Sequence, residues 1–217
     1  MRHKIAKPDS KAAKAPRTKP AEVRLDELMS AAEKLFLAKG VEATTINEIV
    51  EEARVAKGTF YHYFSSKNEM LEALGGRYTS QFLERLREAV DACPEDDWEA
   101  RLRAWISVSV EAYVQTYRTH DIVYTNHHHH DRSNKDKNAI LDQLLDIIEG
   151  GRTAGAWATD QPRIVALLIY SGVHGATDDI IAAQPADCAP FARAVVENCL
   201  RMLGIAETGR SKAAKPR

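Results

Sequence analysis

The chain has 217 residues, 44% of them hydrophobic and 28% charged, and no apolar run approaches the roughly 20 residues of a membrane-spanning helix. The first twenty residues also lack the apolar centre of a secretion signal, so we expect a soluble, cytoplasmic protein. The net charge of −1 conceals basic ends: residues 1–20 carry seven Lys and Arg against one Asp, and residues 205–217 carry four against one Glu. The remaining body is acidic and repels phosphate at long range, which argues against a protein that coats nucleic acid nonspecifically.

The two ends of the chain are rich in Lys, Ala and Pro and hold few side chains that could be buried. We therefore expect a disordered basic arm over residues 1–20 and a disordered basic tail over residues 206–217. Two interpretations stay open for these segments. They are either simply solvated or they contact phosphate groups without sequence preference.

Between these ends the apolar residues recur at helical spacing, and no stretch alternates with a period of two. A first helix is expected from about Leu25 to Gly40. A short helix follows, capped by Thr44 or Thr45, and after a tight break at Arg54 a second short helix ends near Tyr63.

A long helix is predicted to begin at Ser66, where Ser66 and Glu69 have the spacing of a capping box. It contains the pair Gly75 and Gly76. Later helices are expected at residues 97–117, 121–127, 134–150, 161–183 and 189–203. The prediction is an all-α fold of about nine helices.

Two short helices joined by a tight turn, behind a supporting helix, have the geometry of a helix-turn-helix. The segments Thr-Thr-Ile-Asn-Glu-Ile at 44–49 and Val-Ala-Lys-Gly-Thr-Phe-Tyr-His-Tyr-Phe-Ser-Ser-Lys at 55–67 resemble the signature of the TetR family of transcriptional regulators. The resemblance implies a helix-turn-helix DNA-binding domain at residues 21–75, followed by a helical effector-binding and dimerisation domain at residues 76–205.

The same resemblance implies which residues contact double-stranded operator DNA. Thr45 and Lys67 correspond to phosphate anchors at helix N-termini, and Gly58 permits close approach. The candidate DNA-binding residues are Thr44, Thr45, Lys57, Gly58, Thr59, Tyr61, His62 and Lys67. The alternative is that Tyr61 and His62 merely complete an amphipathic face.

Two positions depart from the family pattern. Arg54 stands where the turn often has Gly, and Ala56 stands where the recognition helix often has a Ser cap, which forgoes about 1 kcal/mol of capping. These departures leave open both the turn geometry and whether Arg54 reaches phosphate.

The resemblance also implies a homodimer formed by the last two helices, which are apolar on more of their surface than one buried stripe requires. Gly172 and Gly175 each cost about 1 kcal/mol relative to Ala within a helix and so suggest close helix approach. A partner helix and an internal core contact explain them equally well.

An effector cavity is expected to combine apolar walls with a few polar groups. The alternative is that the aromatic side chains in this half are plain core. The candidate pocket residues are Trp105, Tyr113, Tyr117, Tyr124, Trp157, Tyr170, His174 and Asp178.

Three functions remain open. The first is a repressor released from its operator by an unidentified small-molecule effector. The second is a metal-responsive regulator that uses the imidazoles of His127–His130. The third, an enzyme or binding protein, has the least support, because the common catalytic and nucleotide-binding motifs are missing from the sequence. We therefore expect no catalytic residues, no resident metal and no cofactor.

Overall fold

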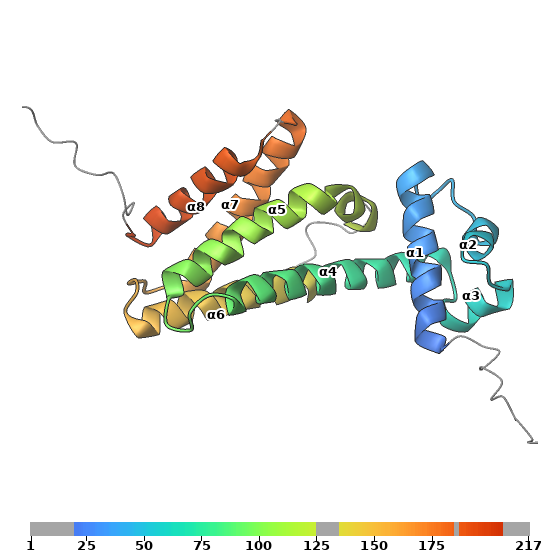
Figure 1. Ribbon diagram of the computed structural model, residues 1–217, viewed down its shortest axis with the longest axis horizontal. Coiled ribbons are helices and arrows are strands. Elements are labelled where there is room, and N and C mark those ends of the chain that lie inside the picture. Colours follow the sequence, from blue (N-terminus) through green and yellow to red (C-terminus); the bar gives the residue numbers. More distant parts are fainter. Residues whose placement is uncertain (1–19, 125–134, 185–186, 206–217) are drawn as a thin grey trace, which may run out of the picture. The chain divides into compact units, whose positions relative to one another are not determined.

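The computed structural model describes residues 20–124, 135–184 and 187–205, and these residues form eight α-helices (Figure 1). They divide into two compact units, one ending at Lys67 and the other beginning at Asn68. The predicted all-α fold is confirmed.

The first unit contains α1 (Ala21–Lys39), α2 (Ile46–Glu52) and α3 (Lys57–Tyr63). The three helices share a small core in which Leu28, Phe36, Ile49 and Phe60 are almost completely buried. The α1 helix ends at Gly40, whose positive φ of 84° suits a residue without a side chain. Packing around this core gives α2 and α3 a fixed mutual geometry, which neither short helix would keep alone.

The turn between α2 and α3 contains Arg54 with φ of +55°, which is the left-handed backbone region. Glycine adopts this region without strain, whereas a residue with a Cβ atom loses about 1–2 kcal/mol there. The expected tight turn is therefore present although the sequence has Arg54 at this position. Ala56 precedes α3 without a side-chain cap, as the sequence predicts.

The second unit contains α4 (Lys67–Asp91, which begins with the last residue of the first unit), α5 (Trp98–Tyr124), α6 (Lys135–Ala154), α7 (Pro162–Ala183) and α8 (Ala189–Met202). The α5 helix lies in its middle, in contact with α6, α7 and α8 (Figure 1). Its buried side chains, including Leu102, Trp105 and Ile106, form the centre of one continuous hydrophobic core.

The expected break between residues 117 and 121 is wrong, because α5 continues through this stretch to Tyr124. The residues between are Arg118, Thr119 and His120, none of which interrupts a helix as Gly or Pro does. The fusion of two predicted helices accounts for the count of eight over the described residues. It also places His120 and Tyr124 on the same helix as Tyr113.

The α7 helix exposes an unusual amount of apolar surface. Ile164 is 49% exposed and Leu168 is 53% exposed, although both are large aliphatic residues. By length and composition α7 is apolar enough to cross a membrane, contrary to the expectation that the chain holds no such stretch. Most of the excess lies on α7, because Val196, Cys199 and Leu200 of α8 are buried within the unit and only Met202 at its end is strongly exposed among its large apolar residues.

Gly172 and Gly175 lie on the same exposed side of α7. A Cβ atom added at either position would meet nothing within 4 Å. The described part of the chain therefore provides no internal packing reason for these glycines. The sequence left open whether these glycines allow an internal core contact or the close approach of a partner helix, and only the second explanation agrees with their open surroundings.

Candidate functional site

The α3 helix presents one buried and one exposed face. Phe60 is completely buried, whereas Lys57, Gly58, Tyr61 and His62 are exposed and Thr59 is half-buried. Tyr61 leaves 52% of its surface in solvent, a high value for a large aromatic residue. An exposed aromatic and cationic face on the second helix of a helix-turn-helix is the surface that enters the major groove in proteins of this type.

Gly58 has no structural reason to be glycine within the described chain. A Cβ atom there would meet nothing within 4 Å, and the backbone is helical. Because glycine costs about 1 kcal/mol relative to alanine in a helix, its presence is best explained by a partner that approaches the backbone closely.

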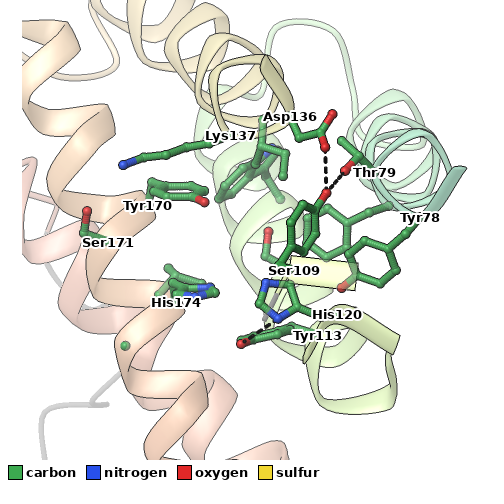
Figure 2. A pocket seen from close by; sticks show the side chains of 16 residues that line it. Tyr78, Thr79, Ser109, Tyr113, His120, Asp136, Lys137, Tyr170, Ser171 and His174 are labelled. Atoms are coloured by element: carbon green, nitrogen blue, oxygen red, sulfur yellow. Dashed lines mark hydrogen bonds between the residues drawn. The ribbon is translucent and has the colours of Figure 1, made fainter. Parts of the chain in front are cut away.

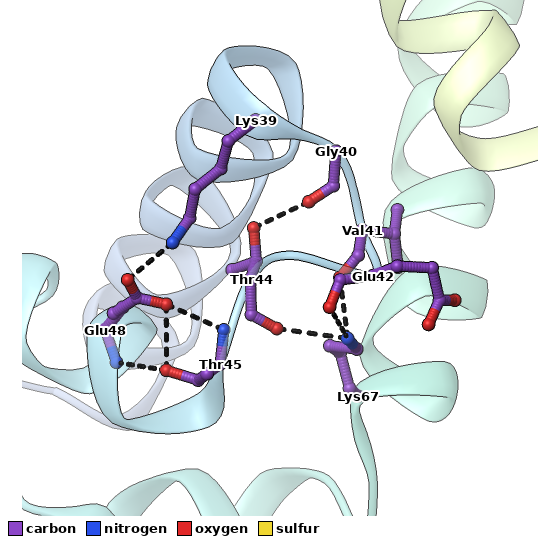
Figure 3. A network of polar contacts seen from close by, with 8 residues as sticks. All are labelled: Lys39, Gly40, Val41, Glu42, Thr44, Thr45, Glu48 and Lys67. Carbon is purple, nitrogen blue, oxygen red and sulfur yellow. Dashed lines mark hydrogen bonds and ion pairs between the residues drawn. The ribbon is translucent and has the colours of Figure 1, made fainter.

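The N-terminus of α2 is closed by a capping box. The Thr45 side chain accepts a hydrogen bond from the Glu48 backbone N–H, and a Glu48 carboxylate oxygen accepts one from the Thr45 N–H at 2.8 Å (Figure 3). Thr45 is thus the cap, which decides between the two candidates. The Lys39 ammonium, 2.5 Å from Glu48, and the bonds to Thr45 lower the pKa of Glu48 to about 2. The carboxylate at this helix end is therefore neutralised by Lys39.

Thr44 and Lys67 have structural contacts that the sequence did not predict. Thr44 is only 1% exposed, and its hydroxyl donates to the Gly40 carbonyl at 2.8 Å. The Lys67 ammonium donates to the carbonyl oxygens of Val41 at 2.6 Å and Thr44 at 3.0 Å (Figure 3). It holds the loop between α1 and α2, and a phosphate contact for Lys67 stays a prediction.

The second unit contains a cavity of about 300 Å³ between α4, α5, α6 and α7. Figure 2 shows side chains from these four helices converging on it. The lining residues are Tyr78, Thr79, Phe82, Trp105, Ser109, Tyr113, His120, Tyr124, Asp136, Lys137, Ile140, Tyr170, Ser171, Val173, His174 and Gly175.

Five of the eight candidate pocket residues belong to this lining, namely Trp105, Tyr113, Tyr124, Tyr170 and His174. Asp178 is not in the lining but accepts a hydrogen bond from the Tyr113 hydroxyl at 2.7 Å. Tyr117 is half-buried outside it.

Trp157 is a core residue rather than a wall of the cavity. Its indole N–H donates to the Ile148 carbonyl at 2.9 Å, and its ring lies directly over Gly151. A methyl group at Gly151 would collide with the indole. The absence of a side chain at Gly151 therefore leaves the space next to α6 that the Trp157 indole occupies.

Several lining residues were not predicted, including Tyr78, Ser109, His120, Asp136 and Lys137. A signal for His120 existed in the sequence, because it lies seven residues after Tyr113 and four before Tyr124, on one face of a continuous helix. The expected break before residue 121 hid that spacing.

Most of the tyrosine hydroxyls in the cavity already make hydrogen bonds to other residues of the protein. The Tyr124 hydroxyl donates to Asp136 at 2.8 Å and contacts the Thr79 hydroxyl. Tyr78 shares a hydrogen bond of 3.1 Å with Thr116. Burial, together with the bonds to Asp136 and Asp178, raises the pKa of Tyr124 and Tyr113 well above the ordinary value, so both phenols stay protonated.

Three rings on one side of the cavity lie nearly parallel. Tyr113 and His174 stack with their centroids 4.8 Å apart and their planes 13° apart, and the planes of Tyr170 and His174 differ by 4°. His120 packs edge-on against Tyr113. Burial lowers the pKa of His120, which favours a neutral imidazole.

The described residues do not support the hypothesis of a metal-responsive regulator. Among them, no group of three or more His, Cys, Asp and Glu side chains is arranged to hold a metal ion. His127–His130 lie outside the described residues, as do residues 1–19 of the basic arm and the whole basic tail.

The fold and the exposed α3 face define a helix-turn-helix DNA-binding protein. The family described as "Bacterial regulatory proteins, tetR family" matches residues 28–74, the segment that contains this motif. Residues 28–74 thus carry the sequence pattern of a TetR-family helix-turn-helix.

Curated relatives agree with this assignment. The transcriptional regulator QacR of Staphylococcus aureus is 23% identical over 161 residues, which cover 69% of this chain and 82% of QacR. The repressor KstR2 of Mycobacterium tuberculosis is 30% identical over 101 residues, which cover 46% of this chain. That match spans about half the length of KstR2, 49% of it.

Solved structures share the fold across both units. A protein of unknown function from Rhodococcus sp. RHA1 has a TM-score of 0.72 at 18% identity, covering 90% of this chain and 99% of that one. The regulator FadR of Bacillus subtilis, solved with stearoyl-CoA, has a TM-score of 0.64 at 20% identity, covering 80% of this chain and 96% of FadR.

Proposed function

We propose that this regulator is a repressor that binds operator DNA as a homodimer through α3 and releases it when a small molecule occupies the cavity of the second unit. It would act in the cytoplasm, where operator DNA is found. Relatives such as KstR2 and NemR of Escherichia coli are repressors, which supports the direction of control. The domains predicted at residues 21–75 and 76–205 would divide DNA binding and effector sensing between them.

The observation that carries the DNA-binding part is the combination of Gly58 with an exposed Tyr61 on one helix. On a helix face that contacts only solvent, both residues are unfavourable, because glycine destabilises the helix and the aromatic ring remains exposed to water. Lys57 and Thr59 would face base edges, while Tyr61 and His62 would contact phosphate.

The test begins with DNA selected for binding from a library of the protein's own genomic region. Tyr61→Ala and Lys57→Ala should weaken binding of the selected duplex by about tenfold, and each lost phosphate contact should lower the salt slope by about 1. Lys34→Ala, an exposed lysine of α1, is the matched control. Unchanged affinity in both α3 variants would contradict the assignment of α3.

The effector part rests on the aromatic cavity of about 300 Å³, a volume at the lower end of the range for ligand pockets. The neighbouring FadR structure contains stearoyl-CoA, so a protein of this fold accommodates a small-molecule ligand. Compounds that bind the cavity should lower operator affinity, and compounds that bind without this effect would contradict effector control.

The dimer part rests on the exposed face of α7 formed by Ile164, Leu168, Gly172 and Gly175, of which Gly175 also borders the cavity. A second copy of α7 would cover the aliphatic residues, and the two glycines would allow close approach of the backbones. Burial of α7 against a second copy of the chain would also explain why a DNA-binding protein contains so apolar a helix.

Analytical ultracentrifugation tests this part. The wild-type chain should sediment as a dimer, and Leu168→Glu should shift it to monomer while the far-ultraviolet circular dichroism stays helical. Leu37→Glu, at an exposed leucine of α1, is the control that should remain dimeric. A monomeric wild type at micromolar concentration would contradict the proposed interface.

A further inference from the structure

One buried hydroxyl in the cavity lacks a partner. Ser109 of α5 is 4% exposed and lines the cavity, and its Oγ makes no hydrogen bond to any residue that the structure describes. Serine in a helix often donates to a backbone carbonyl of the preceding turn, as Thr116 does to Ala112 on the same helix. Leaving such a group unsatisfied costs about 1–3 kcal/mol, so this position is adapted to a polar ligand group.

A second hydroxyl in the lining also makes no hydrogen bond to a described residue. Tyr170 of α7 lines the cavity, and within the described part of the chain its hydroxyl has no hydrogen bond, unlike those of Tyr78, Tyr113 and Tyr124. Figure 2 shows the Tyr170 ring extending from α7 toward the side chains of α5, where Ser109 lies. Two helices thus each present an unused hydroxyl to the same space.

The rest of the wall is aromatic rather than aliphatic. The nearly parallel rings of Tyr113, His174 and Tyr170 form one side, and Tyr78, stacked with Phe82 at 20° between planes, lies on another. Flat aromatic surfaces favour offset stacking or edge-to-face contact with another ring over contact with a flexible chain.

The lining contains one acidic and one basic side chain. Asp136 and Lys137 are adjacent at the start of α6, and both line the cavity. Asp136 already accepts a hydrogen bond from Tyr124, and the Lys137 ammonium lies 5.8 Å from the centre of the Tyr170 ring. The lining therefore has no excess of either charge, and the cavity as a whole does not offset the desolvation of a charged ligand.

From these features we infer that the cavity binds an uncharged planar aromatic compound bearing a hydroxyl or carbonyl group, which hydrogen-bonds to Ser109 and Tyr170. This inference rests on the proposed function, since it names the class of effector for the same cavity. The ring would stack on the aromatic wall, and the polar substituent would satisfy the two unused hydroxyls.

Calorimetric titration of the 217-residue chain with five probes tests the three elements of this inference, namely the aromatic ring, the polar substituent and the absence of charge. The probes are 2-naphthol, naphthalene, 2-naphthoate, 2-naphthyltrimethylammonium and 1-decanol. We expect 2-naphthol to bind at least tenfold tighter than each of the others, which lack the hydroxyl, carry a charge of either sign, or replace the rings by an alkyl chain. Equal or tighter binding of any of these four, or no binding of 2-naphthol up to its solubility limit, would overturn the inference.

Two variants of the cavity lining test whether Ser109 and Tyr170 make the polar contact with the ligand. Ser109→Ala and Tyr170→Phe should each reduce the preference for 2-naphthol over naphthalene by about fivefold, the effect of one neutral hydrogen bond. Ser107→Ala, two residues away on α5 and outside the cavity lining, should leave the preference unchanged. An unchanged preference in both cavity variants would also overturn the inference.

A parallel measurement separates this inference from the proposed function. The affinity for the selected operator duplex is measured with and without saturating 2-naphthol. If 2-naphthol binds with the expected preferences and operator affinity does not change, the ligand class is supported and effector control is contradicted. If binding lacks these preferences but operator affinity falls with another compound, effector control is supported and the ligand class is overturned.

Discussion

The ammonium group of Lys67 lies 3.0 Å from the carbonyl oxygen of Thr44, twenty-three residues earlier in the chain. A second bond of 2.6 Å to the Val41 carbonyl accompanies it. The first residue of α4 thereby fixes the loop that leads into α2. Lys67, which the family resemblance associates with a phosphate contact, thus also makes hydrogen bonds within the protein.

Replacing Lys67 by Met should therefore destabilise the chain as well as affect DNA binding. Losing hydrogen bonds from a charged donor costs about 1.5–3 kcal/mol, which should lower the free energy of unfolding by a similar amount. Chemical denaturation with circular dichroism measures it. Lys67→Arg keeps the charge and serves as the comparison; a Met variant as stable as wild type would show that the loop does not depend on this contact.

Arg54→Gly should stabilise the protein. Relief of the left-handed backbone at φ of +55° gains about 1–2 kcal/mol, from which the larger unfolded-state entropy of glycine subtracts about 0.5–1 kcal/mol. A rise in melting temperature of a few degrees is expected.

Arg54→Ala provides the matched control, since it keeps the strain and removes the same charge. It should show no gain in stability. If Arg54 contacts phosphate, both variants should lose operator affinity equally, with a salt slope lower by about 1. A Gly variant no more stable than the Ala variant would contradict the strain at this turn.

Gly75 and Gly76 in α4 are a candidate hinge between DNA binding and effector sensing. A Cβ atom at Gly75 would lie 3.8 Å from the Val123 Cβ, an ordinary contact, and one at Gly76 would meet nothing within 4 Å. Packing within the second unit therefore does not require either glycine. A glycine pair is a common place for a helix to bend.

The double variant Gly75→Ala/Gly76→Ala should raise the melting temperature, because each glycine costs about 1 kcal/mol in a helix. It should also change the coupling free energy between effector and operator, a quantity of typically about 1–3 kcal/mol. The tightest-binding probe of the naphthalene series supplies the effector at matched saturation. Equal coupling in variant and wild type would leave the hinge without support.

The stability of the second unit should fall as the pH falls below neutrality, and His120 should contribute to this loss. Burial lowers the pKa of folded His120, with His174 adding to the effect and Asp121 opposing it. An unfolded histidine takes up its proton near pH 6.5, so below that pH the unfolded chain binds more protons and gains stability over the folded one.

His120→Gln should therefore lose less melting temperature than wild type between pH 7.5 and pH 5.5, measured by differential scanning calorimetry. The same loss in the His120 variant as in wild type would assign the pH effect to other groups.

The sequence by itself determined the helix-turn-helix. The break at Arg54 and a threonine cap at position 44 or 45 follow from contacts within one or two helical turns, which short-range spacing encodes. The family signature in the same segment made the assignment specific. The identities of the contacted bases do not follow from such spacing.

Only the tertiary structure decided the cavity. Trp105 and Trp157 look alike in the sequence, yet one lines the cavity and the other fills the space above Gly151. Ser109 and Asp136 come from different helices, and their shared wall depends on how α5 and α6 pack. Helix packing is set by the summed fit of many side chains distant in sequence, so no local pattern identifies which aromatic residues surround a cavity and which fill the core.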